Sequence, residues 1–452
     1  MSFYDFQCEI PRDREYDVLV AGGGPAGTAA AVCAARLGMD VLLLEATGCL
    51  GGMGTSGLVC AFDPMADGER ALVGGFQREV VERMYERGEL GPQVTPDFWR
   101  KRFHCWTPFK VEGLKLILDE MTTEAGVDVR FFAQVVAVDC PERGRRVSGV
   151  VANDIEGLKY IPARMFIDCT GDAVLANLCG VECRTNPNFM PGTLCSLHAG
   201  IDWSRVKNQQ GRLEQAIQDG FFAQPDRHLP GLSQVGEHVG YLNGGHLFKL
   251  DALTCAGRTE GMRLGRRLAR EYLDFYRKYV DGCQDMELVA TAPLPGIRES
   301  RRIVGEMELT FDDYISRRKF PDQIGLFNKF VDIHVRDCSD AEYARFQEEH
   351  TKTGILGIGE SFGIPYGILV PRGSENLWVA GRCNSSDERV HGSIRVMPAA
   401  GMMGQAAGTA AAQALRLNQT ASTLDTERLV TTLRDHNAYL PQTTLSREMT
   451  RK

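Results

Sequence analysis

Three glycines near the N-terminus have the spacing that lets a backbone approach a phosphate group. Gly22, Gly24 and Gly27 form a GxGxxG pattern within YDVLVAGGGPAGTAAAVCAARLGMDVLLLEA, residues 16–46. In such a pattern the first glycine permits a tight turn, the second lets the backbone approach a pyrophosphate, and the third lets a helix touch a strand. The pattern therefore predicts a dinucleotide site between a strand and a helix.

The residues around these glycines agree with that prediction. Pro25 and Ala26 suit the first turn of a helix, whose positive N-terminal end faces phosphate oxygens. Glu45 and Ala46 end the next apolar run, where a carboxylate accepts the hydroxyls of a ribose. FAD and NAD share the adenosine diphosphate half, so these residues do not distinguish the two cofactors.

A second glycine-rich segment favours FAD over NAD. GCLGGMGTSG, residues 48–57, contains five glycines shortly after Glu45. Its backbone is suited to lie against the ribityl chain and ring of a flavin, with Gly51, Gly52, Met53, Gly54 and Thr55 as the expected contacts. An NAD-dependent dehydrogenase would instead continue its alternating strands and helices, whereas β-like runs occupy residues 129–168 here.

The C-terminal third contains a second group of candidate residues. A helix built mostly of small residues begins at Pro398, and its first turns contain Gly401 and Met402. We expect its N–H groups to face the N1 and O2 edge of a flavin, where reduced flavin gathers negative charge. Upstream, in VHGSIR, His391 is a candidate acid or base and Arg395 is a candidate anion-binding residue. Arg395 could equally neutralise the reduced flavin, and His391 could be a structural histidine.

Charged residues in the middle of the chain offer further candidates. GIRESRRIVGE, residues 296–306, contains Arg298 and Arg302, either of which could bind an anionic or polyhydroxy substrate, with Arg298 as the first candidate; ion pairs to Glu299 or Glu306 are an equal alternative. The alternation in this segment predicts a strand. Asp332, His334 and His246 are additional polar residues that could line the site.

Composition excludes several classes of function. The net charge is −8 with no long run of either sign, so nucleic acid and anionic membranes are not expected partners. No uninterrupted apolar run approaches the length of a membrane span, and we expect a cytoplasmic protein. The 14 cysteines are scattered without a CxxC pair, which predicts free buried thiols and no metal site.

These residues require an α/β scaffold. We predict strands at 18–21 and 41–44 and helices at 26–37, 73–87, 111–125, 258–279 and 398–415, with Asp172 as the N-cap of a short helix. The predicted fold is a Rossmann-like FAD-binding domain with helices on both faces of a mostly parallel sheet, interrupted by an inserted α+β substrate domain. The expected boundaries are 1–185 and 360–417 for the FAD-binding domain, 186–359 for the insertion, and 418–452 for a peripheral helix or tail.

The chain resembles FAD-dependent oxidoreductases of the glutathione reductase-like class with two dinucleotide-binding domains. The resemblance rests on GGGPAG, LGGMGTSG, FIDCTGD, GIRESRRIVGE and AGRCNSS…HGSIRVMPAAGMMGQAAG, which occur in this order over about residues 16–417. It implies FAD contacts at Val135, Thr170, Gly171, Gly381 and Arg382. The HGxxR element is also similar to that of the distantly related fumarate reductase-type flavoproteins, in which the arginine meets a substrate carboxylate.

The expected activity is hydride exchange between flavin N5 and a small polar substrate, such as a carboxylate or a polyhydroxy compound, by a dehydrogenase or an oxidase. The alternatives are an electron-transfer flavoprotein subunit of a larger redox complex and a flavin-dependent monooxygenase. No second GxGxxG follows a strand and no CxxxxC or CxxC pair lies near the flavin segment, which disfavours a disulfide reductase fed by NAD(P)H. A homodimer is the default expectation for the assembly.

Overall fold

The computed structural model describes residues 4, 7–352 and 355–441. Its main sheet has seven strands, in the order β5 (Asp128–Arg130), β2 (Val41–Leu44), β1 (Tyr16–Ala21), β8 (Gly157–Asp168), β7 (Gly149–Asp154) and β6 (Gln134–Asp139), with β19 (Leu377–Val379) also paired to β8. The pairs among β5, β2, β1, β8 and β19 are parallel, and those of β7 with β8 and β6 are antiparallel. The α/β fold predicted from the sequence is confirmed.

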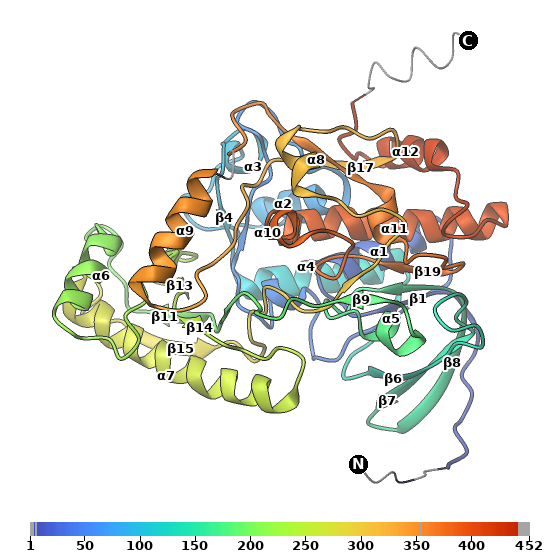
Figure 1. Ribbon diagram of the computed structural model, residues 1–452, viewed down its shortest axis with the longest axis horizontal. Coiled ribbons are helices and arrows are strands. Elements are labelled where there is room, and N and C mark those ends of the chain that lie inside the picture. The colour runs from blue at the N-terminus through green and yellow to red at the C-terminus, as the bar shows by residue number, and fades with distance from the viewer. Residues whose placement is uncertain (1–3, 5–6, 353–354, 442–452) are drawn as a thin grey trace.

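Alternate residues of β1 supply two different hydrophobic cores, because successive side chains of a strand point to opposite faces. Val18 and Val20 belong to the larger core, which also contains helices α1 (Pro25–Arg36), α4 (Val111–Ala125) and α11 (Met397–Leu417). Leu19 and Ala21 belong to a second core, which is closed by β6, β7 and α5 (Val174–Cys179). The central strands are therefore covered on both faces (Figure 1).

Helices α1 and α11 pack with almost no space between their backbones. A Cβ added at Gly404 would lie 2.0 Å from the carbonyl oxygen of Ala26, and one at Gly408 would lie 2.1 Å from that of Ala30. The small residues of α11 thus serve a helix crossing.

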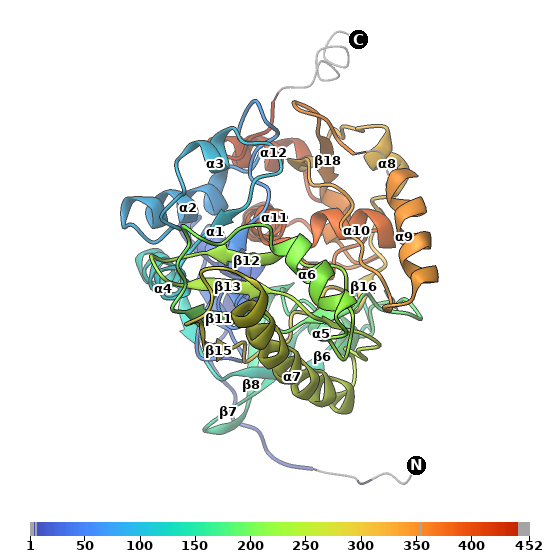
Figure 2. The same ribbon diagram turned by 90° about the vertical axis from the view of Figure 1, so that its left-hand side faces the viewer.

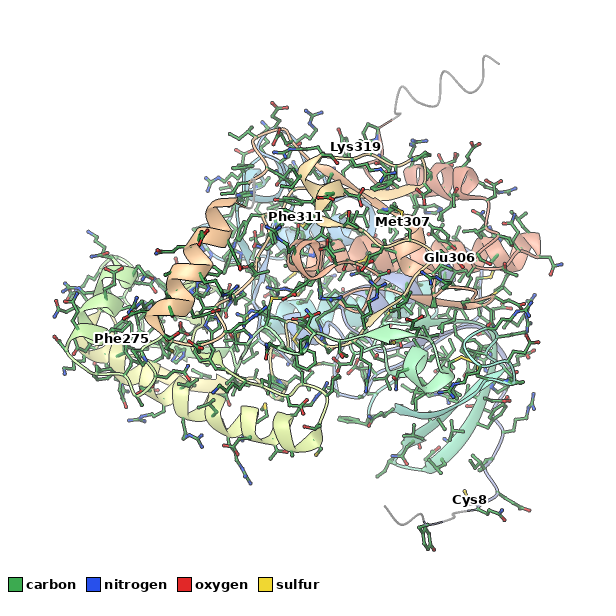
Figure 3. All side chains as sticks on the ribbon, viewed as in Figure 1. Cys8, Phe275, Glu306, Met307, Phe311 and Lys319 are labelled. Carbon is green, nitrogen blue, oxygen red and sulfur yellow. A yellow bond between two sulfur atoms is a disulfide. The ribbon has the colours of Figure 1, made fainter. Side chains whose placement is uncertain are left out.

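A second, antiparallel sheet lies at the other end of the molecule (Figures 1 and 2). Its strand order is β12 (Gly231–Gln234), β13 (Gly240–Asn243), β11 (Ser196–Ala199) and β15 (Glu287–Thr291), and helices α6 (Gln209–Gln218) and α7 (Cys255–Tyr279) accompany it. Aromatic residues of α7, including Phe275, pack in a separate hydrophobic core there (Figure 3). The arrangement matches the expected α+β insertion, whereas the boundaries at 185, 359 and 417 remain predictions.

Short elements connect and cover the two sheets. They are η1 (Gly52–Gly54), β3 (Ala61–Phe62), α2 (Gly75–Glu86), α3 (Asp97–Arg100), β4 (Thr107–Pro108), β9 (Cys183–Arg184), β10 (Gly192–Thr193), β14 (His246–Leu247), β16 (Arg302–Ile303), α8 (Phe311–Ile315), β17 (Gln323–Phe327), α9 (Asp340–Lys352), β18 (Phe362–Pro365), η2 (Tyr366–Leu369), α10 (Glu388–Ile394) and α12 (Thr426–Asp435). Helix α12 packs on α11, as expected for a peripheral helix, and residues 442–452 of the predicted tail lie outside the described residues.

Three local predictions were wrong. The N-cap of α5 is Ala173, and Thr170 Oγ1 and Asp168 Oδ2 accept hydrogen bonds from its first N–H groups, because the Asp172 carboxylate is engaged elsewhere. Only Arg302–Ile303 of the segment 296–306 forms a strand, paired to β9. Cys140 and Cys179 form a disulfide, with their Cα atoms 5.6 Å apart; the other twelve cysteines are free as predicted, but only five of them are buried.

No helix in the described part of the chain is both long enough and apolar enough to cross a bilayer.

Candidate active site

A cavity of about 420 Å³ lies between the two sheets, at the carboxyl ends of β1, β2, β8 and β19. In open α/β sheets, ligands bind outside these strand ends. Thirteen of the predicted cofactor contacts line the cavity: Gly22, Gly24, Pro25, Ala26, Glu45, Ala46, Gly52, Met53, Val135, Thr170, Gly171, Gly381 and Arg382. Thr193, Cys195, Tyr241 and Asn243 of the second sheet region close the opposite side.

The three glycines of the first motif have three different surroundings. Gly22 has a φ of +96°, and a Cβ on it would lie 2.6 Å from the carbonyl oxygen of Cys169. A Cβ on Gly27 would lie 1.7 Å from the carbonyl oxygen of Gly22, so this glycine lets α1 approach β1. Gly24 faces open space inside the cavity, which a side chain would fill. This cradle fits the pyrophosphate of a dinucleotide at the N-terminus of α1.

Glu45 joins the two glycine-rich segments. Its carboxylate accepts hydrogen bonds from the amide of Gly23 at 2.7 Å and from the amide and hydroxyl of Thr47 at 2.7 and 2.8 Å. Each carboxylate oxygen offers two lone pairs, so Glu45 retains acceptor capacity toward the cavity that it lines. The position fits a ribose, and the side chain also fixes the loop that would hold it.

The remaining predicted cofactor residues lie behind the cavity wall. Gly51 turns with a φ of +97°, Thr55 Oγ1 donates to the carbonyl oxygen of Leu50 at 2.6 Å, and a Cβ on Gly54 would meet Leu114 and Met397. Gly27, Gly51, Gly54, Thr55, Pro398, Gly401 and Met402 are not among the lining residues. These seven residues therefore pack outside the residues that line the cavity.

Helix α11 reaches the cavity with its first turn. Val396, Met397 and Ala400 line the cavity, whereas Gly401 faces Gln77 and Met402 packs against Gly325. The start of this helix therefore lies at the cavity, but through Val396, Met397 and Ala400 and not through Pro398, Gly401 and Met402.

An ionic cluster forms the wall near the carboxyl end of β8. The Asp172 carboxylate accepts hydrogen bonds from Ser300 Oγ and Arg382 Nη2, both at 2.7 Å, and from Arg258 of α7. Burial alone would raise the pKa of Asp172, but Arg382 and Arg258 hold that pKa well below its usual range. The cluster links the two sheets and exposes Arg382 and Arg258 to the cavity.

The other end of the cavity is lined by five charged residues: Asp63, Arg298, Lys329, Asp332 and Arg395. Arg395 Nη2 donates to both Oδ2 and the backbone oxygen of Asp332, each at 3.0 Å. Lys329 Nζ is 2.5 Å from Asp63 Oδ2 and 4.0 Å from Asp332 Oδ2. Arg395 Nε is buried and has no hydrogen-bond partner among the described residues.

Arg298 is held in place by neutral groups. Its Nη1 donates to the carbonyl oxygen of Pro191 at 2.7 Å and to Thr193 Oγ1 at 2.9 Å. Burial, followed by the positive charge of Arg395, lowers the pKa of Arg298 to about 10, so it remains charged at neutral pH. The internal ion pair considered for this segment is made by Arg302 and Glu299, at 3.1 Å.

His391 does not contact the cavity. It is fully buried in α10, and neither ring nitrogen has a hydrogen-bond partner among the described residues. Burial lowers the pKa of His391, and the charges of Arg302, Arg395 and Arg382 lower it further. Its placement gives no support to a role as acid or base.

Sequence reasoning missed Asp63, Arg258 and Lys329. Lys329 had a recognisable signal, because it and Asp332 are the two charged residues in the otherwise largely apolar run IGLFNKFVDIHV, residues 324–335. The sequence around Asp63 and Arg258 contains no such signal, because their partners, Lys329 and Asp172, are far away in the chain. Asp332 lines the cavity as considered, whereas His334 and His246 lie beside it, with His228.

Known proteins resemble this chain in sequence or in structure. Digeranylgeranylglycerophospholipid reductase 2 of Methanothermobacter thermautotrophicus is 30% identical over 201 residues, 42% of this chain and 48% of that protein, so the match spans about half the length of the relative. A geranylgeranyl bacteriochlorophyll reductase-like protein of Thermoplasma acidophilum gives a TM-score of 0.47 at 13% identity, covering 93% of this chain and 82% of that one.

The flavin-dependent brominase Bmp2 gives a TM-score of 0.46 at 12% identity, covering 93% and 83% of the two chains. These two structural similarities are too low to say anything about a substrate. The family model described as FAD dependent oxidoreductase matches residues 17–433, which includes every wall of the cavity. The chain therefore belongs to the FAD-dependent oxidoreductases, with FAD as its cofactor.

Proposed function

We propose that the enzyme exchanges a hydride between FAD and a small polar substrate that carries an anionic group, acting as a dehydrogenase or an oxidase. Bound FAD supplies the hydride acceptor or donor. The protein supplies a cavity that positions the substrate and pairs its negative charge. The observation that supports this proposal is the excess of buried cations at one end of the cavity.

Three cations and two carboxylates meet at that end. Arg298, Lys329 and Arg395 exceed Asp63 and Asp332 by one positive charge. An uncompensated charge that is removed from water is costly, and an anionic ligand would balance it. The rest of the lining is largely apolar, which strengthens an ion pair made inside it.

Arg395 is the best placed of the three cations to bind the anion. Asp332 occupies its Nη2 and fixes the guanidinium plane, while Nε remains without a partner. A guanidinium binds a carboxylate through two parallel N–H groups, and a bond of this kind both attracts and orients the substrate. Arg298 is anchored through one Nη only, and it could contact a second polar group of the same molecule.

The test uses matched pairs of compounds. The oxidised enzyme is mixed without oxygen with hydroxy acids, amino acids and unsaturated acids, each beside its methyl ester, which lacks the carboxylate charge, and flavin bleaching is followed. We expect an acid to bleach the flavin and its ester to react far more slowly. Admitting air then distinguishes an oxidase, which reoxidises quickly, from a dehydrogenase.

In Arg395→Ala, the acid that bleaches the wild-type flavin should reduce the flavin roughly 10- to 100-fold more slowly, because a hydrogen bond to a charged group is lost. The variant should retain its bound FAD. Arg266→Ala, on the exposed side of α7, is the matched control and should leave the rate unchanged. Full activity in Arg395→Ala, or equal rates for acid and ester, would overturn the proposed anion site.

A further inference from the structure

Three histidines from separate segments converge beside the cavity. His246 in β14 and His334 after β17 are buried, and His228 precedes β12 with its ring partly exposed. One ring nitrogen from each lies within 4.8 Å of the other two. The ring planes of His246 and His334 are nearly perpendicular, at 82°, with centroids 5.0 Å apart.

His246 and His334 lie against each other, and each also lies near a carboxylate. His246 Nδ1 is 2.9 Å from Asp226 Oδ2, and His334 Nε2 is 3.3 Å from Asp332 Oδ1. Neither contact has the geometry of a hydrogen bond, and buried His246 Nδ1 has no hydrogen-bond partner among the described residues. The carboxylates nevertheless favour the tautomers that carry the proton on these outer nitrogens, because a neutral imidazole has only one proton. In those tautomers His246 Nε2 and His334 Nδ1, which are 2.9 Å apart, both present lone pairs to each other.

A proton or a metal ion between these two nitrogens would remove the repulsion between their lone pairs. The carboxylates on the outer nitrogens are the partners that metal-ligating histidines usually have, because they fix the ring orientation and make the inner nitrogen more basic. A shared proton would satisfy only two of the three rings. The third ring, His228, makes no hydrogen bond with any group that the structure describes, and it offers a nitrogen to the same point.

We propose that His228, His246 and His334 bind one divalent transition-metal ion. Imidazole nitrogens suit zinc, iron, nickel and copper, and three histidines leave at least one coordination position open. Tetrahedral ligands about 2.0–2.1 Å from zinc stand about 3.3 Å from one another. The pair at 2.9 Å must therefore open slightly and His228 must rotate inward, as its partly exposed position permits.

The charges around the three rings favour a cation. Asp226 and Asp332 supply two negative charges, and Arg298 is the cation that faces the rings. Tyr343 donates its hydroxyl to Asp226 Oδ1 at 3.0 Å and so fixes that carboxylate. Because Asp332 also holds Arg395, a metal ion at this point would stabilise the segment that carries the anion-binding end of the cavity.

The experiment measures metal content directly. The FAD-containing enzyme is analysed for transition metals by mass spectrometry, dialysed against a chelator, and then equilibrated with Zn²⁺. We expect about one zinc ion per chain, with nitrogen neighbours at about 2.0–2.1 Å in the extended fine structure of the zinc X-ray absorption spectrum. His228→Ala should retain less than about one-tenth of the zinc at the same free concentration, and His228→Asp, which restores a ligand, should retain more.

His238→Ala is the matched control, since this ring is exposed and lies outside the cluster. FAD content shows that each variant is folded. Equal zinc binding by His228→Ala and the wild type, or no binding by a wild type that retains its FAD, would overturn the proposal and leave a shared proton between the rings. Neither result depends on the substrate, so this test is independent of the proposed anion site.

Discussion

Lys329 Nζ lies 2.5 Å from Asp63 Oδ2, and the two side chains are only 2% and 12% exposed. The residues are 266 positions apart in the sequence. Their ion pair ties the loop after the second glycine-rich segment to the segment that carries Asp332. It is one of the contacts that hold the two sides of the cavity together.

Lys329→Met should destabilise the protein by about 3–5 kcal/mol, because it leaves the carboxylate of Asp63 buried without its partner. The double variant Lys329→Met with Asp63→Leu should recover much of this loss, since no lone charge remains. The free energy of unfolding in urea measures both effects. Lys115→Met, which removes a more exposed ion pair on α4, is the control and should cost less than about 1 kcal/mol. A double variant no more stable than the single one would contradict this account.

Gly404→Ala should weaken both stability and FAD retention. The new Cβ would lie 2.0 Å from the backbone oxygen of Ala26, so α1 would have to move away from α11, at a cost of about 1–3 kcal/mol. Since α1 begins at the glycine motif, its displacement should also release FAD more readily. Gly357→Ala is the control, because its Cβ would meet Glu360 at an ordinary 3.5 Å. Thermal unfolding and FAD fluorescence after dilution measure the two effects, and unchanged values for Gly404→Ala would argue against this packing.

His198 should make stability depend on pH in the acidic range. It is fully buried in β11, with Nε2 2.9 Å from Ser196 Oγ, and burial lowers its pKa from 6.5 to about 4. Above pH 6.5 the ring is neutral in the folded and unfolded chains, so it contributes no slope. Between pH 6.5 and 4 only the unfolded chain takes up the proton. The free energy of unfolding therefore decreases as the pH is lowered from 6.5 to 4, by about 3 kcal/mol in total.

The measurement is urea unfolding of the wild type and His198→Gln across this range. The wild type should lose more stability than the variant as pH falls from 6.5 to 4, and the difference should become constant below pH 4. Parallel curves would show that His198 is not the group responsible.

Local patterns determined the elements that hold the cofactor. The GxGxxG spacing, the apolar runs of β1 and β2 and the small residues of α11 each predict one element, because strand alternation, helix capping and close helix packing depend on neighbouring residues. The same locality explains one failure. Asp172 looks like an N-cap in sequence, but Arg258 and Arg382, both distant in the chain, take its carboxylate.

The sequence by itself determined an FAD-dependent oxidoreductase with a Rossmann-like fold, and it identified Arg298 and Arg395 as cations of interest. Only the tertiary structure decided that Lys329 joins them, that Asp332 orients Arg395, that His391 lies outside the cavity, and that three histidines meet next to it. The physical reason is that a charge acquires its role from what surrounds it in space. Burial and long-range pairing fix those surroundings, and neither is written in the spacing of nearby residues.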